Sequence, residues 1–376
     1  MRVVHVISGL GHGGAEAMLE KLILTARRRD PSVEHIVISL GDIGPVGARL
    51  LDAGVAVESM AITASASGLL KFPRLVRRLR RAGPESVVQT WMWHGDLLGG
   101  LAARLAGNNR VVWNIRNSIP SSPSLSKSAI LVARLCALLS RSIPSRIICN
   151  AQAGMDAHCV IGYDAAKCVV IPNGFNMDRF RHSTEARDAL RRRWHVQAGE
   201  FLMGMVARMD PLKDHQNFIL SAAHAAARAA VPMRFVLVGE GVPENVELRQ
   251  QIAGVGLSER FLLEGHHEDV PGVMSALDGF CLSSKSEGFP NVLGEAMACE
   301  TPSITTDVGD TRIVLGDDQW VVSASDPSAL GVKMLALAAL PEMDRIALGK
   351  KQRARIDSLF GIDRIWQSYR ELYETV

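Results

Sequence analysis

The sequence predicts an α/β protein built from two doubly wound, parallel-sheet domains, and three observations lead to this class. The chain has 376 residues, more than one hydrophobic core usually serves. Short runs rich in Val and Ile alternate with helical stretches, which is typical of βαβ units. The alternation pauses after Pro172, Asn173 and Gly174 and then starts again. Because the strand runs are apolar throughout, helices should cover both faces of each sheet.

The first domain is expected at residues 1–172 and the second at residues 173–360. The last segment, residues 361–376, has the pattern of an amphipathic helix that either closes the second domain or crosses back to the first. We predict that it crosses back. The runs expected to be strands are 3–8, 35–40, 55–60, 86–90, 110–115, 146–150 and 167–172 in the first domain, and 201–207, 233–239, 260–265, 278–284 and 301–307 in the second.

The composition is that of a globular protein, with 47% hydrophobic and 22% charged residues. No apolar run reaches the length of a membrane span, and the first residues lack the long apolar stretch of a secretory signal. We therefore expect a cytoplasmic location. The six cysteines form no C-x-x-C pair, so they are interpreted as small buried side chains in a reducing compartment, with neither a disulfide framework nor a zinc site.

The charge is distributed unevenly between the halves. Residues 1–172 carry 20 Lys and Arg against 11 Asp and Glu, whereas residues 173–376 carry 22 against 28. Residues 71–81 and 126–146 hold basic and apolar residues but no acid. These segments predict peripheral association with an anionic membrane surface; the alternatives are a solvated helix face for the first and core packing for the second. Nucleic-acid binding is not expected, because no aromatic residues are interleaved with the charges.

Two carboxylates in the second domain have a spacing that suggests a ligand site. Glu287 follows a strand-like run, and Glu295 lies eight positions later in a helical run. Gly288 and Pro290 between them indicate a tight turn into the helix. The start of a helix binds anions through its free N–H groups, and carboxylates accept hydrogen bonds from hydroxyl groups. A nucleotide sugar, with a diphosphate between a ribose and a hexose, fits this layout.

A glycine-rich loop follows the first strand and allows three interpretations. Gly9, Gly11 and Gly14 match the G-x-G-x-x-G pattern of dinucleotide-binding proteins, which would indicate an NAD-dependent oxidoreductase. That pattern expects an acid about 20 residues further on. Here Asp42 comes 28 residues after Gly14, which weakens the match. The loop could instead be a turn that needs glycine for steric reasons, or an amide-rich loop that approaches a ligand held mainly by the other domain.

Four segments, taken together, resemble one protein family. They are GGAE (13–16), IPNGFNMDRF (171–180), GMVARMDPLKDHQNFI (204–219) and SEGFPNVLGEAMACETPSITTDVG (286–309). The third contains Arg-x4-Lys and the fourth contains E-x7-E. In this order they resemble the retaining glycosyltransferases of family 4. The resemblance implies the GT-B architecture, in which two Rossmann-like domains face each other, the first binding the acceptor and the second the nucleotide sugar.

The resemblance also implies roles for individual residues. Arg208 and Lys213 match the positions that bind the donor diphosphate and offset charge on the leaving nucleotide. Glu287 matches the position that contacts the donor sugar, and Glu295 the one that holds the ribose hydroxyls. A solvated Arg–Lys pair and a carboxylate that complements the helix dipole are the structural alternatives. The other expected donor-site residues are Gly13, Gly14, Gly265, Val270, Phe289, Asn291, Val292 and Leu293.

The acceptor side departs from the family pattern. Many members carry a His after the fifth strand of the first domain, where this chain has Arg116. His94, after the fourth strand, is the nearest histidine, so Arg116 and His94 are both catalytic candidates; His94 could instead cap a helix that begins at Gly95–Asp96. Trp91 and Trp93 either stack on a sugar or belong to the core. No carboxylate can be assigned as a nucleophile.

We therefore predict a retaining glycosyltransferase that moves a hexose or N-acetylhexosamine to a glycan or lipid-linked acceptor, in polysaccharide, lipopolysaccharide or glycolipid synthesis. UDP is the expected carrier. The enzyme is expected to need no cofactor or metal, because the adjacent His266 and His267 lack a ligand pattern and are more simply exposed. The alternatives are the oxidoreductase and a catalytically silent nucleotide-sugar-binding protein of the same fold.

Overall fold

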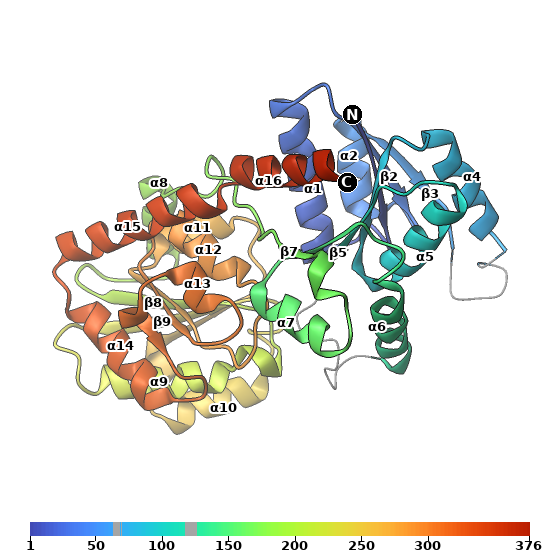
Figure 1. Ribbon diagram of the computed structural model, residues 1–376. Helices are drawn as coiled ribbons and strands as arrows, with labels where there is room; N and C mark the ends of the chain where they lie inside the picture. Colours follow the sequence, from blue (N-terminus) through green and yellow to red (C-terminus); the bar gives the residue numbers. More distant parts are fainter. Residues whose placement is uncertain (63–67, 69, 117–125) are drawn as a thin grey trace. The chain divides into compact units, whose positions relative to one another are not determined.

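The computed structural model describes residues 1–62, 68, 70–116 and 126–376 (Figure 1). The chain divides into two compact units. The first unit contains Met1–Gly174 together with Ile362–Val376, and the second contains Phe175–Gly361. The expected boundary fell between residues 172 and 173, within the same short connection. Each unit holds one parallel sheet, in agreement with the fold class that the sequence predicts.

The sheet of the first unit has seven strands in the order β3-β2-β1-β4-β5-β6-β7, and each pairing among its described strands is parallel. In strand β1, Val3, Val4 and Val6 are fully buried. Because neighbouring residues of a strand point to opposite faces, both faces of the sheet are covered here. The strands are β1 (Arg2–Ile7), β2 (Glu34–Ser39), β3 (Ala56–Ser59), β4 (Val87–Trp91), β5 (Val111–Ile115), β6 (Arg146–Cys149) and β7 (Cys168–Val170).

Two hydrophobic clusters show which helices cover each face. One cluster joins the sheet to α1, α2 and α16, and the other joins it to α4, α5 and α6. Between β6 and β7 lie α7 and the short helix η1. The helices of this unit are α1 (Gly14–Arg29), α2 (Gly44–Asp52), α4 (Phe72–Ala82), α5 (Met92–Leu105), α6 (Lys127–Leu139), α7 (Gln152–Val160), η1 (Ala165–Lys167) and α16 (Ile362–Thr375).

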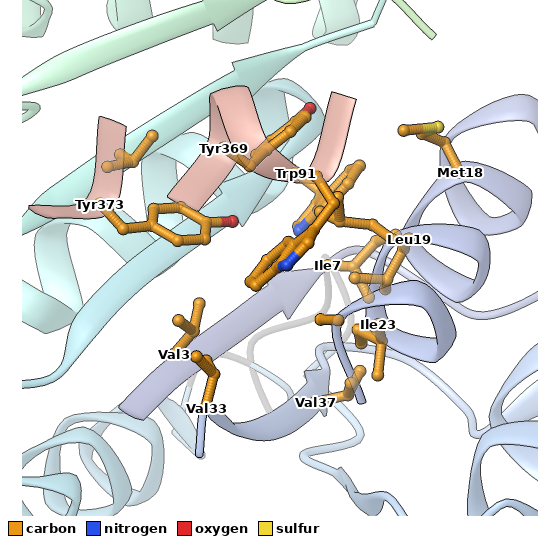
Figure 2. Packing of buried hydrophobic residues seen from close by; sticks show 14 of the residues in the cluster. Val3, Ile7, Met18, Leu19, Ile23, Val33, Val37, Trp91, Tyr369 and Tyr373 are labelled. Atoms are coloured by element: carbon orange, nitrogen blue, oxygen red, sulfur yellow. The ribbon is translucent and has the colours of Figure 1, made fainter. Parts of the chain in front are cut away.

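Helix α16 returns to the first unit and completes its core, as predicted. Tyr369 and Tyr373 are fully buried and pack beside Trp91 of β4 (Figure 2). At the rim of the helix, Asp363 forms an ion pair of 2.5 Å with Arg29 of α1. The apolar face of this helix is therefore part of the core of the first unit, although the chain passes through the whole second unit before reaching it.

Buried histidines in the first unit are held as neutral rings. His35 accepts through Nδ1 a hydrogen bond of 3.0 Å from Nε2 of His5, whose Nδ1 accepts one of 3.2 Å from the indole of Trp91. Nε2 of His158 likewise accepts from the indole of Trp93 at 3.0 Å. Burial lowers the pKa of His35 to about 4, with a smaller contribution from Arg27, and burial also lowers the pKa of His158 to about 4.

The sheet of the second unit has six strands in the order β10-β9-β8-β11-β12-β13, again with parallel pairing. The two-residue strand β13 is not among the predicted runs. The strands are β8 (Phe201–Val206), β9 (Met233–Val238), β10 (Phe261–Glu264), β11 (Gly279–Leu282), β12 (Ser303–Thr306) and β13 (Val321–Val322).

The helices of the second unit are mostly short, and several begin at a side-chain cap. Asp214, Asn245 and Asp269 each accept a hydrogen bond from a backbone N–H of the helix that follows. The helices are α8 (Thr184–Arg193), η2 (Pro211–Lys213), α9 (His215–Ala226), α10 (Val246–Gly254), η3 (Ser258–Arg260), α11 (Val270–Ala276), α12 (Asn291–Ala298), α13 (Thr311–Leu315), η4 (Asp318–Trp320), α14 (Pro327–Ala339) and α15 (Glu342–Phe360).

The cysteines are all free thiols. Four of them are buried, as expected, and Cys159 and Cys168 are only partly buried. Among the helices that the structure describes, none has both the length and the apolar character that crossing a membrane would require.

Candidate functional site

The candidate donor site lies at the carboxyl ends of the strands in the second unit. Strands β8 and β11 are neighbours in the sheet, but the chain leads outward from them in opposite directions, to β9 and to β12. Such a reversal of strand order leaves a crevice at the carboxyl ends, where doubly wound sheets bind ligands. Arg208 and Lys213 follow β8, and Glu287 follows β11, so the sheet places these three residues at the reversal.

Lys213 and Glu287 meet directly. Nζ of Lys213 lies 2.7 Å from Oε1 of Glu287, and the hydroxyl of Ser284 donates a hydrogen bond of 2.7 Å to the same oxygen. The side chain of Glu287 is only 10% exposed and that of Lys213 is 24% exposed. Both described bonds go to Oε1, which leaves Oε2 of Glu287 for a hydroxyl group of a ligand.

Arg208 lies at the rim of the same crevice, with 67% of its side chain exposed. Its only described ion pair is with Asp210, at 2.8 Å. Burial alone would raise the pKa of Asp210, but hydrogen bonds from the Leu212 N–H and from Arg208 bring this pKa below its ordinary value. Arg208 is thus oriented by a carboxylate and remains accessible to an anionic ligand.

Backbone contacts fix the turn that carries Lys213. The hydroxyl of Ser283 donates to the carbonyl oxygens of Lys213 and Asp214, both at 3.1 Å. The N–H of Lys285 donates to the carbonyl of Leu212 at 2.8 Å. Asp214 adopts the left-handed conformation, with φ of 52°, and caps α9. The segments after β8 and β11 are therefore bonded to each other on both sides of Lys213.

A third segment, the turn after β12, packs against the backbone of Glu287 and Gly288. Gly309 has φ of +54°, and a Cβ placed on it would lie 2.3 Å from the carbonyl oxygen of Glu287. The N–H of Asp310 donates to the carbonyl of Gly288 at 3.0 Å. Only glycine allows this close approach, so Gly309 sets the position of the backbone that carries Glu287.

The donor-site residues predicted at the start of α12 fall into a buried group and an exposed group. Phe289 and Leu293 are buried, and the ring of Phe289 packs between Phe175 and Phe360 with centroid distances of 6.0 and 5.8 Å. Only the backbone of Phe289 and Leu293 can therefore reach a ligand. Asn291 is exposed, and Val292 and Glu295 are partly exposed, at the start of α12. The side chains of these three residues are therefore accessible to a ligand.

The loop between β10 and α11 borders a separate small cavity of about 150 Å³. Its lining includes Val270, which the sequence analysis assigned to the donor site, and Arg208, which joins it to the crevice. Gly265, at the start of the loop, is partly exposed and close to Pro243. The remaining lining residues are Val206, Ala207, Val238, Gly239, Glu240, His266, His267 and Val273.

Sequence reasoning missed Ser284, Asp210 and the supporting role of Gly309. Asp210 and Gly309 lie inside the segments that carry the family resemblance, so both could have been considered as residues near the site. Their contacts could not be predicted, because they depend on which strands are neighbours. Ser284 precedes Glu287 by three residues at the end of a strand, and a hydroxyl in that position could have been considered as a partner for the carboxylate.

Gly13 and Gly14 lie in the first unit at the start of α1. Gly13 is the N-cap of this helix, no side chain caps it, and both glycines are exposed. The preceding loop is anchored through Leu10, whose carbonyl accepts a hydrogen bond from Val46 at 3.1 Å. This places free backbone N–H groups of a 16-residue helix at the carboxyl edge of the first sheet.

His94 is exposed and lies in the first turn of α5. The suggestion that it caps a helix beginning at Gly95–Asp96 is wrong: α5 begins at Met92, and no side chain caps it. The helix starts early because Met92, with φ of 67°, turns the chain directly after β4. Trp91 and Trp93 are both buried, so they belong to the core and do not offer a face to a sugar.

Arg116 is committed to contacts within the first unit. Its guanidinium donates to Oη of Tyr369 at 3.3 Å and to Asn114 at 3.4 Å, bonds to the side chain of Asn173, and lies 5.4 Å above the ring of Trp91. Burial lowers its pKa, which the hydroxyl of Tyr369 partly offsets. Arg116, which follows β5, therefore connects the end of that strand to α16 through Tyr369 and to the segment after β7 through Asn173.

No metal centre is visible in the part of the chain that the structure describes: it contains no group of three or more His, Cys, Asp or Glu side chains placed to hold an ion. His266 is exposed and His267 is partly buried. Arg208 and Lys213 place two cationic side chains at the crevice.

Two family models match the chain. The one described as Glycosyltransferase Family 4 matches residues 12–179, and the one described as Glycosyl transferases group 1 matches residues 200–339. The first covers most of the first unit, with the loop of Gly13 and Gly14. The second covers most of the second unit, with all the residues of the crevice.

Relatives and solved structures agree with these matches. The EpsF protein of Bacillus subtilis, provisionally named a glycosyltransferase, is 27% identical over 355 residues, which are 90% of this chain and 88% of that protein. UDP-Gal:alpha-D-GlcNAc-diphosphoundecaprenol alpha-1,3-galactosyltransferase of Escherichia coli is 28% identical over 64% of this chain and 63% of its own length. The crystal structure of Anabaena HepE in complex with UDP has the same fold, with a TM-score of 0.84, 23% identity and full coverage of both chains.

These matches decide between the transferase and the oxidoreductase that the sequence allowed. The chain is a transferase and not an oxidoreductase, since both units match models of glycosyltransferase domains and the relatives are named as glycosyltransferases. The protein belongs to the glycosyltransferases of family 4 and has the GT-B architecture.

Proposed function

We propose that this enzyme transfers a hexose or N-acetylhexosamine from a UDP-sugar to a lipid-linked or polysaccharide acceptor, with retention of the anomeric configuration. The observation that carries the proposal is the Lys213–Glu287 pair beside Arg208, where the strand order of the second sheet reverses. It combines two cations for a diphosphate with a carboxylate for sugar hydroxyls.

The two cations take different parts in this proposal. Arg208, exposed and able to bind two oxygens at once, grips the diphosphate. Lys213, a compact charge bonded to Glu287, stabilises the negative charge that grows on the leaving phosphate. These two side chains supply the charge that a metal ion would supply in another enzyme, so we expect transfer to proceed without added metal.

Glu287 and Glu295 hold the two sugars on either side of the diphosphate. Oε2 of Glu287 accepts a hydroxyl of the transferred sugar, while Oε1 stays with Lys213 and Ser284. Glu295, on the first turns of α12, accepts the ribose hydroxyls. The cavity bordered by Val270 receives the base, and Gly265 presents its backbone there.

The transfer step needs no nucleophile from the protein. The bond between C1 of the sugar and the phosphate oxygen breaks, and the acceptor oxygen bonds to C1 on the same face. The acceptor proton passes to the departing phosphate oxygen, whose charge Lys213 and Arg208 stabilise. Glu287 is bonded to Lys213 and oriented by Ser284, which fits a binding role. His94, exposed in the first turn of α5, is the candidate for a contact to the acceptor or sugar.

The choice of UDP rests on the relatives. The Escherichia coli relative is named for UDP-Gal and for a diphosphoundecaprenol acceptor, and the Anabaena protein of the same fold is solved with UDP. A lipid-linked acceptor also accords with the excess of basic residues in the first half of the chain. Such an acceptor would place the enzyme at the cytoplasmic face of a membrane during glycan assembly.

A ligand panel tests this proposal in one experiment. Thermal unfolding is measured with UDP-, GDP- and ADP-sugars and with NAD⁺ and NADH. We expect UDP-sugars to raise the melting temperature of the wild type and Lys213→Ala to weaken that shift. Stabilisation by NAD⁺ or NADH alone would contradict the proposal. Release of UDP in the presence of undecaprenyl-diphosphate-linked sugars then separates an enzyme from a silent binding protein, and the anomeric proton of the product reports retention or inversion.

A further inference from the structure

The outer face of α6 carries three exposed leucines that the core does not use. Leu131, Leu135 and Leu138 are 59%, 40% and 73% exposed and are spaced four and three residues apart, so they form one stripe along the helix. We call this stripe the α6 leucine face. We propose that it docks into the surface of an anionic phospholipid bilayer.

The opposite side of α6 meets the needs of the fold without these leucines. Ala133, Cys136 and Ala137 are buried and belong to the cluster that joins α4, α5 and α6 to the sheet. From the sequence, core packing was the alternative to membrane association for residues 126–146. In the structure the fully buried residues of α6 are small, Val132 and Leu139 pack partly against the same core, and Leu131, Leu135 and Leu138 face outward.

Positive charge borders the α6 leucine face. Lys127, Arg134 and Arg141 are exposed on the same helix or directly after it, and no Asp or Glu occurs from residue 126 to residue 155. An apolar stripe flanked by cations fits a surface with negative headgroups above hydrocarbon. A partner with an acidic surface would satisfy the cations but would leave the leucines against polar groups.

Helix α4, on the same face of the sheet, adds positive charge but no apolar side chains that could enter a bilayer. Leu75 and Leu79 are buried in the core, so the apolar side of α4 faces the sheet. Its outer side carries exposed arginines, while Arg78 is paired with Glu58 at 2.7 Å. Helix α5 packs against both α4 and α6, so all three cover one face of the sheet (Figure 1). The exposed arginines of α4 are Arg74, Arg77, Arg80 and Arg81.

Charge also argues against a second copy of this chain as the occupant. A symmetric pairing through the α6 leucine face would bring Lys127, Arg134 and Arg141 of one copy next to the same residues of the other. No acid on this stretch could offset them. A bilayer containing phosphatidylglycerol or cardiolipin supplies the missing negative charge.

The first test is co-sedimentation with vesicles of phosphatidylcholine containing phosphatidylglycerol, compared with phosphatidylcholine alone. We expect wild type to bind the anionic vesicles, and the triple variant L131S/L135S/L138S to bind at least about tenfold more weakly. K127Q/R134Q/R141Q should lose the preference for anionic lipid. The control L220S/M343S/L359S removes exposed apolar residues of the second unit and should bind like wild type.

The second test reads insertion directly. All six native tryptophans are buried, with exposures of at most 3%. In Leu135→Trp the added indole is exposed, so quenching by lipids brominated along the acyl chain should appear in this variant and be absent in Leu220→Trp. Equal vesicle binding by the triple leucine variant and wild type would overturn the proposal. So would a wild-type dimer in solution that L131S/L135S/L138S converts to monomer.

This inference deepens the proposed lipid-linked acceptor, but it is tested without turnover. Vesicle binding does not require a donor, and UDP release with a water-soluble acceptor does not require vesicles. The triple leucine variant should therefore keep wild-type activity on a soluble acceptor. If vesicle binding fails while UDP-sugar binding succeeds, only the docking surface is wrong; the reverse result would reject only the transfer reaction.

Discussion

Nζ of Lys213 lies 2.7 Å from Oε1 of Glu287, although the two residues are 74 positions apart in the sequence. The contact exists because β8 and β11 are neighbours in the sheet. Before a donor binds, the cation and the carboxylate neutralise each other inside the crevice. A diphosphate that approaches Lys213 therefore meets a lysine already oriented by a fixed partner, and little reorganisation is required.

Replacing Lys213 by alanine should reduce kcat by about 10²- to 10³-fold, the usual effect of removing one group that stabilises charge in a transition state. The fold should persist, because the turn around Lys213 is held by backbone contacts. Steady-state release of UDP measures the effect. Lys351→Ala is a matched control, since Lys351 forms an exposed pair with Asp317 on the same unit. Unchanged turnover in Lys213→Ala would remove this residue from the mechanism.

Replacing Gly309 by alanine should both destabilise the second unit and weaken donor binding. The new Cβ would lie 2.3 Å from the carbonyl oxygen of Glu287 and would require a residue other than glycine at φ of +54°. We expect the free energy of unfolding to fall by about 1–3 kcal/mol. Chemical denaturation and calorimetric titration with UDP measure the two effects.

Gly256→Ala separates strain from displacement. Gly256 also has a positive φ, of +71°, but a Cβ there would meet nothing within 4 Å. This control should lose about 1 kcal/mol from backbone strain alone and should bind UDP normally. Equal donor affinity in both variants would show that Gly309 does not position Glu287.

His94 and Arg116 should respond differently to truncation. His94 is exposed in the first turn of α5, so His94→Ala should leave the free energy of unfolding within about 0.5 kcal/mol of wild type. If it contacts sugar or acceptor, turnover should fall by about 10²-fold. Arg116→Ala removes bonds to Tyr369, Asn114 and Asn173, and each hydrogen bond to a charged group contributes about 1.5–3 kcal/mol.

Thermal unfolding and kinetics on the same two variants distinguish the roles. A stable His94→Ala with low turnover, beside a destabilised Arg116→Ala, would assign His94 to the site and Arg116 to the structure. A fully stable Arg116→Ala with no activity would reverse that assignment and return Arg116 to the catalytic group.

The stability of the first unit should fall as the pH is lowered. The pKa of His35 and that of His158 are about 4 in the folded protein, against 6.5 as the ordinary value. The unfolded chain therefore binds more protons between pH 6.5 and pH 4, and this contribution to stability is complete above that window and is lost through it. Each imidazole should remove about 2 kcal/mol from the free energy of unfolding by pH 5.

Urea denaturation at pH 8 and pH 5 measures this loss, and His158→Gln provides the comparison. Glutamine can accept the hydrogen bond of the Trp93 indole without titrating, so the difference between the two pH values should shrink. His12→Gln, at an exposed histidine, should leave the difference as in wild type. A pH dependence that is identical in all three proteins would contradict the neutral, buried state of His158.

The strands were predictable because each is a mainly apolar run between turn signals, and most contain β-branched residues. All twelve predicted runs correspond to strands. The strand β13 was missed because two residues are too few to show the alternation of a strand. The side of a helix that faces the core was less accessible. In α4 the leucines point inward, whereas in α6 three leucines (Leu131, Leu135 and Leu138) point outward, and periodicity alone does not distinguish these cases.

The residues of the donor crevice were predictable as separate motifs, through the family resemblance. Their contacts were not. Whether Lys213 meets Glu287 depends on the order of β8 and β11 in the sheet, and the part of Gly309 depends on the approach of a third turn. One interpretation placed the start of α5 at Gly95–Asp96, whereas the helix begins at Met92. Met92 has a positive φ, a conformation that few non-glycine residues adopt, so no signal in the sequence marks this start.

The return of α16 to the first unit has a consequence for synthesis on the ribosome. Residues 175–361 are contiguous and emerge as one stretch, but the first unit lacks Tyr369 and Tyr373 until that whole stretch has been translated. During that interval the surface around Trp91 stays open to chaperones and proteases. Truncation before Tyr369 would thus damage the core of the first unit while leaving residues 175–361 complete.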